Sequence, residues 1–239
     1  MALQWCSQEN DILNTKRMKQ GDGSAMKQAE PSPLFRSEPS PCFIGVLGGT
    51  FDPIHNGHLA IAQAALDKFS LSKVIFMPTG TPPHKTSIAK ADIRLEMTTM
   101  ATSSNPYFEV SRLELDRSGP SYTVDTLAEL LDIYGNTIKI YYILGGDILF
   151  DLSKWKDFQK IFSMCAIMAV ARPGINHKKL ESQIKTLSKN YGAKIHLLNS
   201  PPIEVSSTMV RKAISLGHSV KGLVPESVTD YIKKNNLYK

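Results

Sequence analysis

Apolar runs of strand length alternate with helical periodicity from residue 43 to the end of the chain, and this alternation limits the possible fold more than any other feature. The runs predict strands over 43–47, 73–77, 108–110, 138–144, 165–171 and 194–198. The periodic segments predict helices over 58–69, 93–103, 123–134, 150–162, 178–191, 208–216 and 225–236. Continuously apolar strands are typical of a parallel sheet that helices cover on both faces. With right-handed crossovers, the sequence predicts one α/β domain over 42–239 with a doubly wound parallel sheet.

The composition narrows the classes of function. No apolar run approaches the roughly 20 residues that cross a bilayer, so no membrane partner is expected. The net charge of +6 suits an anionic ligand, but no basic stripe interleaved with aromatics indicates nucleic acid. The three cysteines form no C-x-x-C pair, which gives no zinc knuckle and favours a reduced, cytoplasmic setting. The oligomeric state stays open.

Residues 1–41 differ from the rest of the chain. They are polar and aperiodic and end in A-E-P-S-P-L-F-R-S-E-P-S-P, a composition that buries too little apolar surface to offset the entropy of ordering. They contain no apolar segment of the kind found in secretory signals. We expect a disordered leader, or an upstream start codon with translation beginning at Met18 or Met26.

The loop after the first predicted strand reads G-G-T-F-D-P-I-H-N-G-H over 48–58. Glycines let a ligand approach the backbone, and a helix N-terminus offers free N–H groups to an anion. His55 and His58 lie three residues apart, so both can face one bound group. These features predict a cradle for a triphosphate. The alternatives are a plain strand-to-helix turn and half of a metal site, which no further His or Cys cluster completes.

Two later segments have the same character. V-S-S-T-M-V-R, over 205–211, can cap a helix or can add hydroxyls, N–H donors and the fixed cation of Arg211 to a phosphate site. Asp147 follows the strand over 138–144 behind Gly145 and Gly146, where a carboxylate can accept ribose hydroxyls or can cap the next helix.

These motifs resemble those of the nucleotidyltransferases with an H-x-G-H signature, and within them the nicotinate-nucleotide adenylyltransferase family. The resemblance covers 43–238 and rests on G-G-T-F-D-P-I-H-N-G-H-L, P-T-G-T-P-P-H-K, P-S-Y-T-V-D-T-L, L-G-G-D-I-L-F-D-L-S-K-W-K-D-F-Q-K-I, V-A-R-P-G and V-S-S-T-M-V-R. It implies a Rossmann-like fold. It also implies adenylyl transfer from ATP to nicotinate mononucleotide, which gives deamido-NAD and pyrophosphate in NAD biosynthesis. Mg²⁺ would arrive with ATP, because no carboxylate cage for it is evident.

The resemblance also implies roles for single residues. The expected catalytic residues are His55, His58 and Arg211. The expected ATP-binding residues are Gly48, Gly49, Thr50, Phe51, His55, His58, Gly145, Asp147, Ser206, Ser207, Thr208 and Arg211. The expected residues for nicotinate mononucleotide are Pro83, His84, Lys85, Thr123, Trp155 and Lys156. Trp155 would stack on the pyridine ring, while the Thr123 hydroxyl and the Lys156 backbone N–H would hold the carboxylate. His84 and Lys85 would belong to a mobile loop that closes on substrate. Arg94 would have a structural or substrate-supporting role, unless it is a surface charge.

Other readings of the same motifs remain. An adenylyltransferase for phosphopantetheine typically has Thr where His55 stands, and a cytidylyltransferase usually differs around the second Ser-Thr motif. A class I aminoacyl-tRNA synthetase shares H-x-G-H but needs a K-M-S-K-S-like loop, which the sequence lacks. A non-catalytic nucleotide sensor is the alternative from a different functional class.

Overall fold

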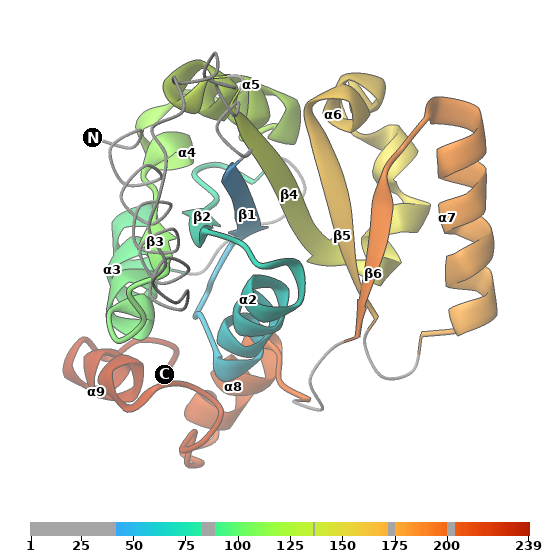
Figure 1. Ribbon diagram of the computed structural model, residues 1–239. Helices are drawn as coiled ribbons and strands as arrows, with labels where there is room; N and C mark the ends of the chain where they lie inside the picture. The colour runs from blue at the N-terminus through green and yellow to red at the C-terminus, as the bar shows by residue number, and fades with distance from the viewer. Residues whose placement is uncertain (1–41, 83–88, 136, 172–174, 200–203) are drawn as a thin grey trace, which may run out of the picture.

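One parallel sheet organises the computed structural model, which describes residues 42–82, 89–135, 137–171, 175–199 and 204–239. The strands are β1 (Cys42–Gly49), β2 (Lys73–Pro78), β3 (Phe108–Val110), β4 (Ile138–Gly145), β5 (Cys165–Ala171) and β6 (Ile195–Asn199). They run parallel in the order β3-β2-β1-β4-β5-β6 (Figure 1). The predicted doubly wound α/β fold is confirmed. The predictions for 1–41 lie outside the described residues.

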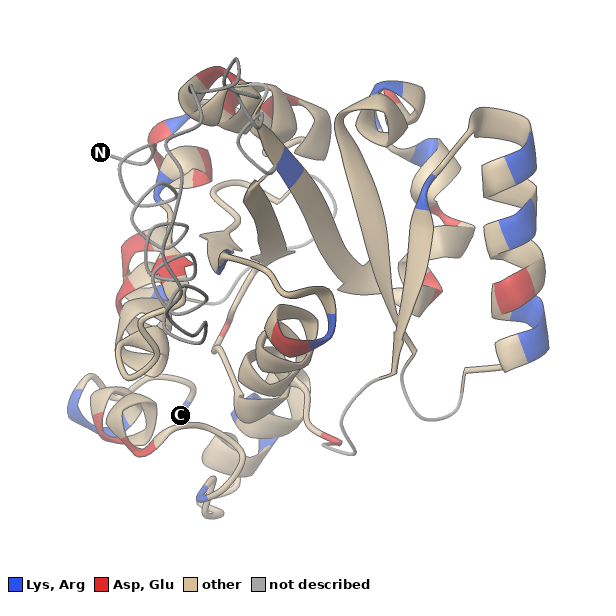
Figure 2. Cartoon of the chain, in the orientation of Figure 1, with Lys and Arg blue, Asp and Glu red and all other residues tan. Residues whose placement is uncertain are grey.

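Helices cover both faces of the sheet. They are α2 (Asn56–Phe69), α3 (Ala91–Thr102), α4 (Leu113–Asp116), α5 (Thr123–Tyr134), α6 (Phe158–Met164), α7 (His177–Tyr191), α8 (Ser207–Ser215) and α9 (Glu226–Lys234). Two short 3₁₀ helices, η1 (Gly146–Phe150) and η2 (Leu152–Lys154), follow β4. Figure 2 shows charges mainly on the helices and few on the strands, as expected for strands that are buried on both sides.

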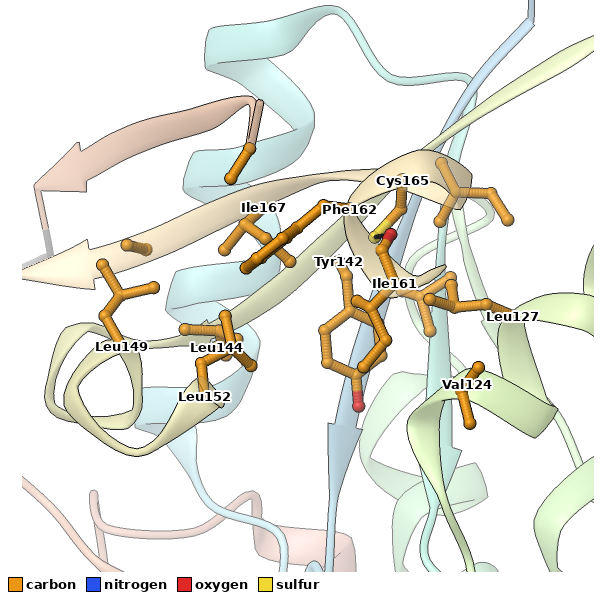
Figure 3. Packing of buried hydrophobic residues seen from close by; sticks show 14 of the residues in the cluster. Val124, Leu127, Tyr142, Leu144, Leu149, Leu152, Ile161, Phe162, Cys165 and Ile167 are labelled. Atoms are coloured by element: carbon orange, nitrogen blue, oxygen red, sulfur yellow. Dashed lines mark hydrogen bonds between the residues drawn. The ribbon is translucent and has the colours of Figure 1, made fainter. Parts of the chain in front are cut away.

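The two faces form separate apolar cores. On one face, α5, α6 and α7 pack on the sheet through residues such as Leu127, Ile161 and Leu180. Figure 3 shows part of this core, including Cys165, whose thiol donates to the carbonyl of Ile161. On the other face, α2, α3, α8 and α9 pack on the sheet. Covering both faces leaves the loops at the strand ends as the places where side chains can meet a ligand.

The predicted helix over 150–162 is wrong. The segment forms η1, η2 and, after a break, α6. Leu149 and Leu152 are fully buried at a spacing of three, which a 3₁₀ turn satisfies as well as an α-helix does. Trp155 then has extended backbone, and Asp157 has a left-handed φ of 49°, so no continuous helix passes through. As a result, Trp155 lies at the end of η2 and not within a helix. The short α4 was not predicted.

The strand order places a topological switch between β1 and β4. The chain proceeds from β1 outward through β2 to β3, and then from β4 outward through β5 to β6 on the other side. In open sheets of this kind, ligands bind in the crevice outside the carboxyl ends of the strands at such a point. The loops after β1 and β4 therefore flank the expected binding crevice.

A buried arginine holds two of these loops together. Arg94 on α3 is completely buried, so the alternative of a surface charge is wrong. Its guanidinium donates to four backbone carbonyls at 2.6–3.2 Å. The acceptors are Thr50 after β1, Thr79 and Gly80 after β2, and Ala89. A planar group with five donors suits this task, and the structural one of the two roles expected for Arg94 is confirmed.

Replacing Arg94 should therefore destabilise the fold strongly. Arg94→Met keeps much of the side-chain volume but leaves four carbonyls, partly or fully buried, without their donors, and we expect a loss of at least about 3 kcal/mol in the free energy of unfolding. Urea denaturation measures it. Arg112→Met is the matched control, because Arg112 is half-exposed and makes only surface ion pairs, worth up to about 1 kcal/mol. Equal losses for the two variants would contradict the role of Arg94.

Candidate active site

The two histidines of the β1 loop lie at the start of α2. His55 is the residue before the helix, and His58 lies in its first turn. The backbone N–H of His55 donates to Nδ1 of His58 at 3.2 Å. The two imidazole rings stack with their centroids 3.6 Å apart and their planes 21° apart. A ring nitrogen that accepts a hydrogen bond carries no hydrogen, so neutral His58 has its proton on Nε2. The cap of the helix thus makes Nε2 of His58 a donor.

Phe51 packs against the His58 ring of this pair. Its backbone has a left-handed φ of 49°, and the residue is 2% exposed. The ring meets His58 edge to face, with centroids 5.0 Å apart, and packs on Phe76 at 6.0 Å. Sequence reasoning placed Phe51 among the ATP-binding residues, and the structure places its side chain in the core beneath His58.

Three glycines at the end of β1 and the start of α2 are needed for packing inside the protein. A Cβ on Gly48 would lie 2.5 Å from the hydroxyl oxygen of Tyr142, and one on Gly49 would lie 2.8 Å from the ring of Phe51. A Cβ on Gly57 would lie 2.9 Å from the side chain of Val205. Neighbouring groups therefore approach the backbone where a side chain would stand. This is a second physical reason for glycine beside the approach of a ligand.

The N-terminus of α8 joins the same loop. Ser206 caps α8, and its hydroxyl accepts from the N–H of Met209 at 3.2 Å. The Ser207 hydroxyl donates to the carbonyl of Pro53 at 2.9 Å. The guanidinium of Arg211 donates to the carbonyl of Asp52 at 2.7 Å, and contacts the Thr208 hydroxyl at 3.4 Å. The structure thus brings Arg211 to the loop that carries His55 and His58. Ser206 is a helix cap, which is the simpler of its two predicted roles.

A second cluster lies at the carboxyl end of β4. Tyr142 is buried, and its ring meets Trp155 edge to face with centroids 6.4 Å apart. Its hydroxyl lies 3.4 Å from that of Thr123 on α5. Burial raises the pKa of Tyr142, so the hydroxyl keeps its proton at neutral pH. In Figure 3 the hydroxyl points away from the labelled apolar side chains.

Tyr142 is the residue of this cluster that sequence reasoning missed. It lies inside an apolar strand beside Tyr141, and no pattern distinguishes the two. Only the structure shows that its hydroxyl faces both Gly48 and Thr123, and so connects the carboxyl end of β1 with the cluster around Trp155.

The remaining predicted residues have varied positions. Asp147 is exposed in η1, beyond the end of β4 at Gly145. The ammonium of Lys156 pairs with Asp125 at 3.0 Å and lies 4.8 Å from the centre of the Tyr122 ring. This ties the Lys156 side chain back to α5.

Some predicted elements cannot be compared with the structure. Pro83, His84 and Lys85, and part of the V-A-R-P-G segment, lie outside the described residues. Among the residues that are described, no group of three or more His, Cys, Asp or Glu could hold a metal ion. No helix within the same residues is long and apolar enough to cross a membrane.

Solved structures similar to this one share its fold. A Plasmodium falciparum nicotinic acid mononucleotide adenylyltransferase complexed with NaAD matches with a TM-score of 0.66 and 22% identity, over 82% of this chain and 97% of that one. The same enzyme complexed with APC matches with a TM-score of 0.64. At this level of identity the match extends to the fold alone.

Sequence comparison goes further. The family described as cytidylyltransferase-like matches residues 46–213. A "probable nicotinate-nucleotide adenylyltransferase" of Moorella thermoacetica is 44% identical over 198 residues, covering 82% of this chain and 91% of that protein. A protein of the same name from Dictyoglomus thermophilum is 44% identical over 196 residues, covering 82% of this chain and 98% of its own length. On these matches, the chain belongs to the nicotinate-nucleotide adenylyltransferase family.

Proposed function

We propose that this protein transfers the adenylyl group of ATP to nicotinate mononucleotide, with deamido-NAD and pyrophosphate as products. One observation carries the proposal: the histidine loop after β1, the start of α8 and the Tyr142–Trp155 cluster all meet around the β1–β4 switch point. We assign the phosphates of ATP to the histidine part of this arrangement and the pyridine mononucleotide to its aromatic part. A reaction that joins a nucleotide triphosphate to a pyridine mononucleotide needs both.

The chemistry asks for positioning and charge neutralisation. The 5′-phosphate of nicotinate mononucleotide attacks the α-phosphorus of ATP in line, an oxygen–phosphorus bond forms, and the bond to the β-phosphate oxygen breaks. The nucleophile is already an anion, so no protein base is required. Negative charge grows on the leaving pyrophosphate and on the oxygens around the α-phosphorus.

We assign the neutralisation of this negative charge to His55, His58 and Arg211. The Nε2–H of His58, fixed as a donor by its contact with the His55 backbone, can donate to a phosphate oxygen. Arg211 already uses one guanidinium nitrogen on the carbonyl of Asp52, which orients its other donors. The remaining proposed ATP contacts are Gly48, Gly49, Thr50, Gly145, Asp147, Ser206, Ser207 and Thr208. Phe51, the other residue of the predicted set, is buried and would act through its packing on His58.

We assign the nicotinate moiety to the aromatic cluster around Tyr142 and Trp155. Trp155 offers a face for the pyridine ring, and the Thr123 hydroxyl and the Lys156 backbone N–H offer donors to its carboxylate. The resemblance assigns the Lys156 backbone N–H to the substrate, and the pairing of its ammonium with Asp125 is compatible with that assignment. Pro83, His84 and Lys85 complete the proposed set.

Mg²⁺ enters with the ATP phosphates in this proposal, and it supplies further neutralisation of their charge. The cytoplasm, where ATP and NAD precursors are available, is the proposed location. Residues 1–41 are proposed to take no part in the reaction.

The choice of acceptor tests this function. Pyrophosphate release is measured with ATP and a panel of acceptors: nicotinate mononucleotide, nicotinamide mononucleotide, phosphopantetheine and a choline phosphate control. A pocket of donors accepts both oxygens of a carboxylate, whereas the NH₂ of an amide would face another donor. We expect nicotinate mononucleotide to exceed nicotinamide mononucleotide by at least ~100-fold in kcat/KM.

A variant of Trp155 separates stacking from this discrimination. Trp155→Ala should weaken both pyridine substrates while leaving most of their ratio, and Trp155→Phe should restore part of the loss, because stacking does not distinguish the two rings. Equal kcat/KM for the two mononucleotides in the unaltered protein would refute the donor-only pocket. Turnover with phosphopantetheine alone would refute the proposed function.

His58 provides a second prediction. His58→Ala should lower kcat by about 10²–10³, the usual loss when one preorganised donor to a transition-state anion is removed. The alanine also removes the acceptor for the His55 N–H, so His58→Asn is the control that offers an oxygen to that N–H. Circular dichroism melting tests whether each variant folds. A folded His58→Ala protein with unchanged kcat would contradict the phosphate role.

A further inference from the structure

The C-terminal end of the chain returns to the loop that carries the histidines. The hydroxyl of Tyr238, the penultimate residue, donates to a carboxylate oxygen of Asp52 at 2.7 Å. Asp52 is only 4% exposed and Tyr238 is partly buried, so this contact is shielded in part from solvent. In Figure 1, α9 and the C-terminus lie beside α3 and α8, below the segment that joins β1 to α2. A contact across 186 positions of sequence therefore closes on a residue three positions before His55.

Asp52 accepts further hydrogen bonds besides the one from Tyr238. Its carboxylate accepts from the backbone N–H of Ala89 at 3.3 Å, and its carbonyl accepts from Arg211 at 2.7 Å. Each contact comes from a different part of the chain: the residues before α3, α8, and the segment after α9. Asp52 is thus the point at which these parts fix the β1 loop.

The other end of the loop is also held by the C-terminal third. The backbone N–H of Asn56 donates to the carbonyl of Leu223 at 2.9 Å, and its side-chain amide donates to the carbonyl of Gly222 at 2.8 Å. Between these anchors lie Pro53, Ile54 and His55. The position of His55, and of His58 in the first turn of α2, therefore depends on contacts at both ends of this short segment.

We propose that Tyr238 is a positioning residue for the reaction: by holding Asp52, the chain end fixes where His55 and His58 stand relative to the triphosphate. This inference rests on the proposed function. Tyr238 does not touch the substrates in this account, and it acts only through Asp52. The charges that face its hydroxyl are those of Asp52, Arg94 and Arg211. Burial and the bond to Asp52 raise the pKa of Tyr238, so the hydroxyl keeps its proton and remains a donor.

Tyr231 supplies a matched control. It belongs to α9, in the same C-terminal segment, and its hydroxyl also donates to a carboxylate, that of Glu96 on α3. Neither Tyr231 nor Glu96 lies in the segment between β1 and α2. Tyr231→Phe removes the same kind of bond from the same segment without touching Asp52.

The experiment compares Tyr238→Phe with Tyr231→Phe. A shift of the catalytic groups of about 1 Å can cost 10²-fold in rate, so the loss of one of several anchors should lower kcat by about tenfold. The KM for nicotinate mononucleotide should stay within about twofold, because its proposed contacts lie elsewhere. Hydrogen exchange of the backbone amides over 50–58 should become faster in Tyr238→Phe only. In Tyr231→Phe, kcat should stay within about twofold of the unaltered protein.

Three results would overturn the inference: unchanged kcat in Tyr238→Phe, equal losses of kcat in both variants, or unchanged exchange over 50–58. Failure of the proposed function would look different. The unaltered protein would then release no pyrophosphate with nicotinate mononucleotide, and the exchange comparison would still decide whether Tyr238 holds the loop.

Discussion

The guanidinium of Arg94 is the interaction on which the geometry of the site depends. Loops at the carboxyl ends of parallel strands leave backbone carbonyls without partners from the sheet, and burying such groups unpaired is costly. Arg94 supplies hydrogen-bond donors to both loops, the one after β1 and the one after β2. Its nitrogens lie 2.6 Å from the Thr50 carbonyl oxygen and 2.7 Å from the Thr79 carbonyl oxygen. The loop that reaches His55 therefore starts from a fixed point. Asp52, Asn56 and the C-terminal third of the chain then fix the rest of it.

The residues of the site make contacts that hold the fold together, in addition to their proposed chemical roles. His58 accepts from the His55 backbone as part of the start of α2, and that same contact decides which of its nitrogens carries the proton. Gly48 makes room for the Tyr142 hydroxyl, which in turn lies beside Thr123. Ser207 binds the carbonyl of Pro53. A substitution at these positions therefore acts on the loop and on the ligand together, which is why conservative control variants are needed to separate the two effects.

Much of this could be predicted from the sequence, for identifiable reasons. The six strands were recognisable because buried parallel strands are continuous apolar runs, and the histidine loop because glycines and histidines stood between a strand and a helix. The break in the helix before Trp155 could not be recognised from the sequence, because Leu149 and Leu152 at a spacing of three fit an α-helix and a 3₁₀ turn equally. Tyr142 and Tyr238 were missed because their importance comes from contacts with Gly48 and Asp52, which are distant in the sequence. Local patterns contain no information on such contacts.

The claim at the centre of this account is that the fold presents His58 as an Nε2–H donor to a bound triphosphate. Nitrogen-15 NMR of the histidine side chains tests it most directly, with a His58→Asn variant to assign the signals. We predict that His58 has an unprotonated Nδ1 and a protonated Nε2 in the free protein, and that its Nε2 signal shifts when ATP and Mg²⁺ are added. A proton on Nδ1 in the neutral ring, or an Nε2 signal that does not respond to ATP, would contradict the account.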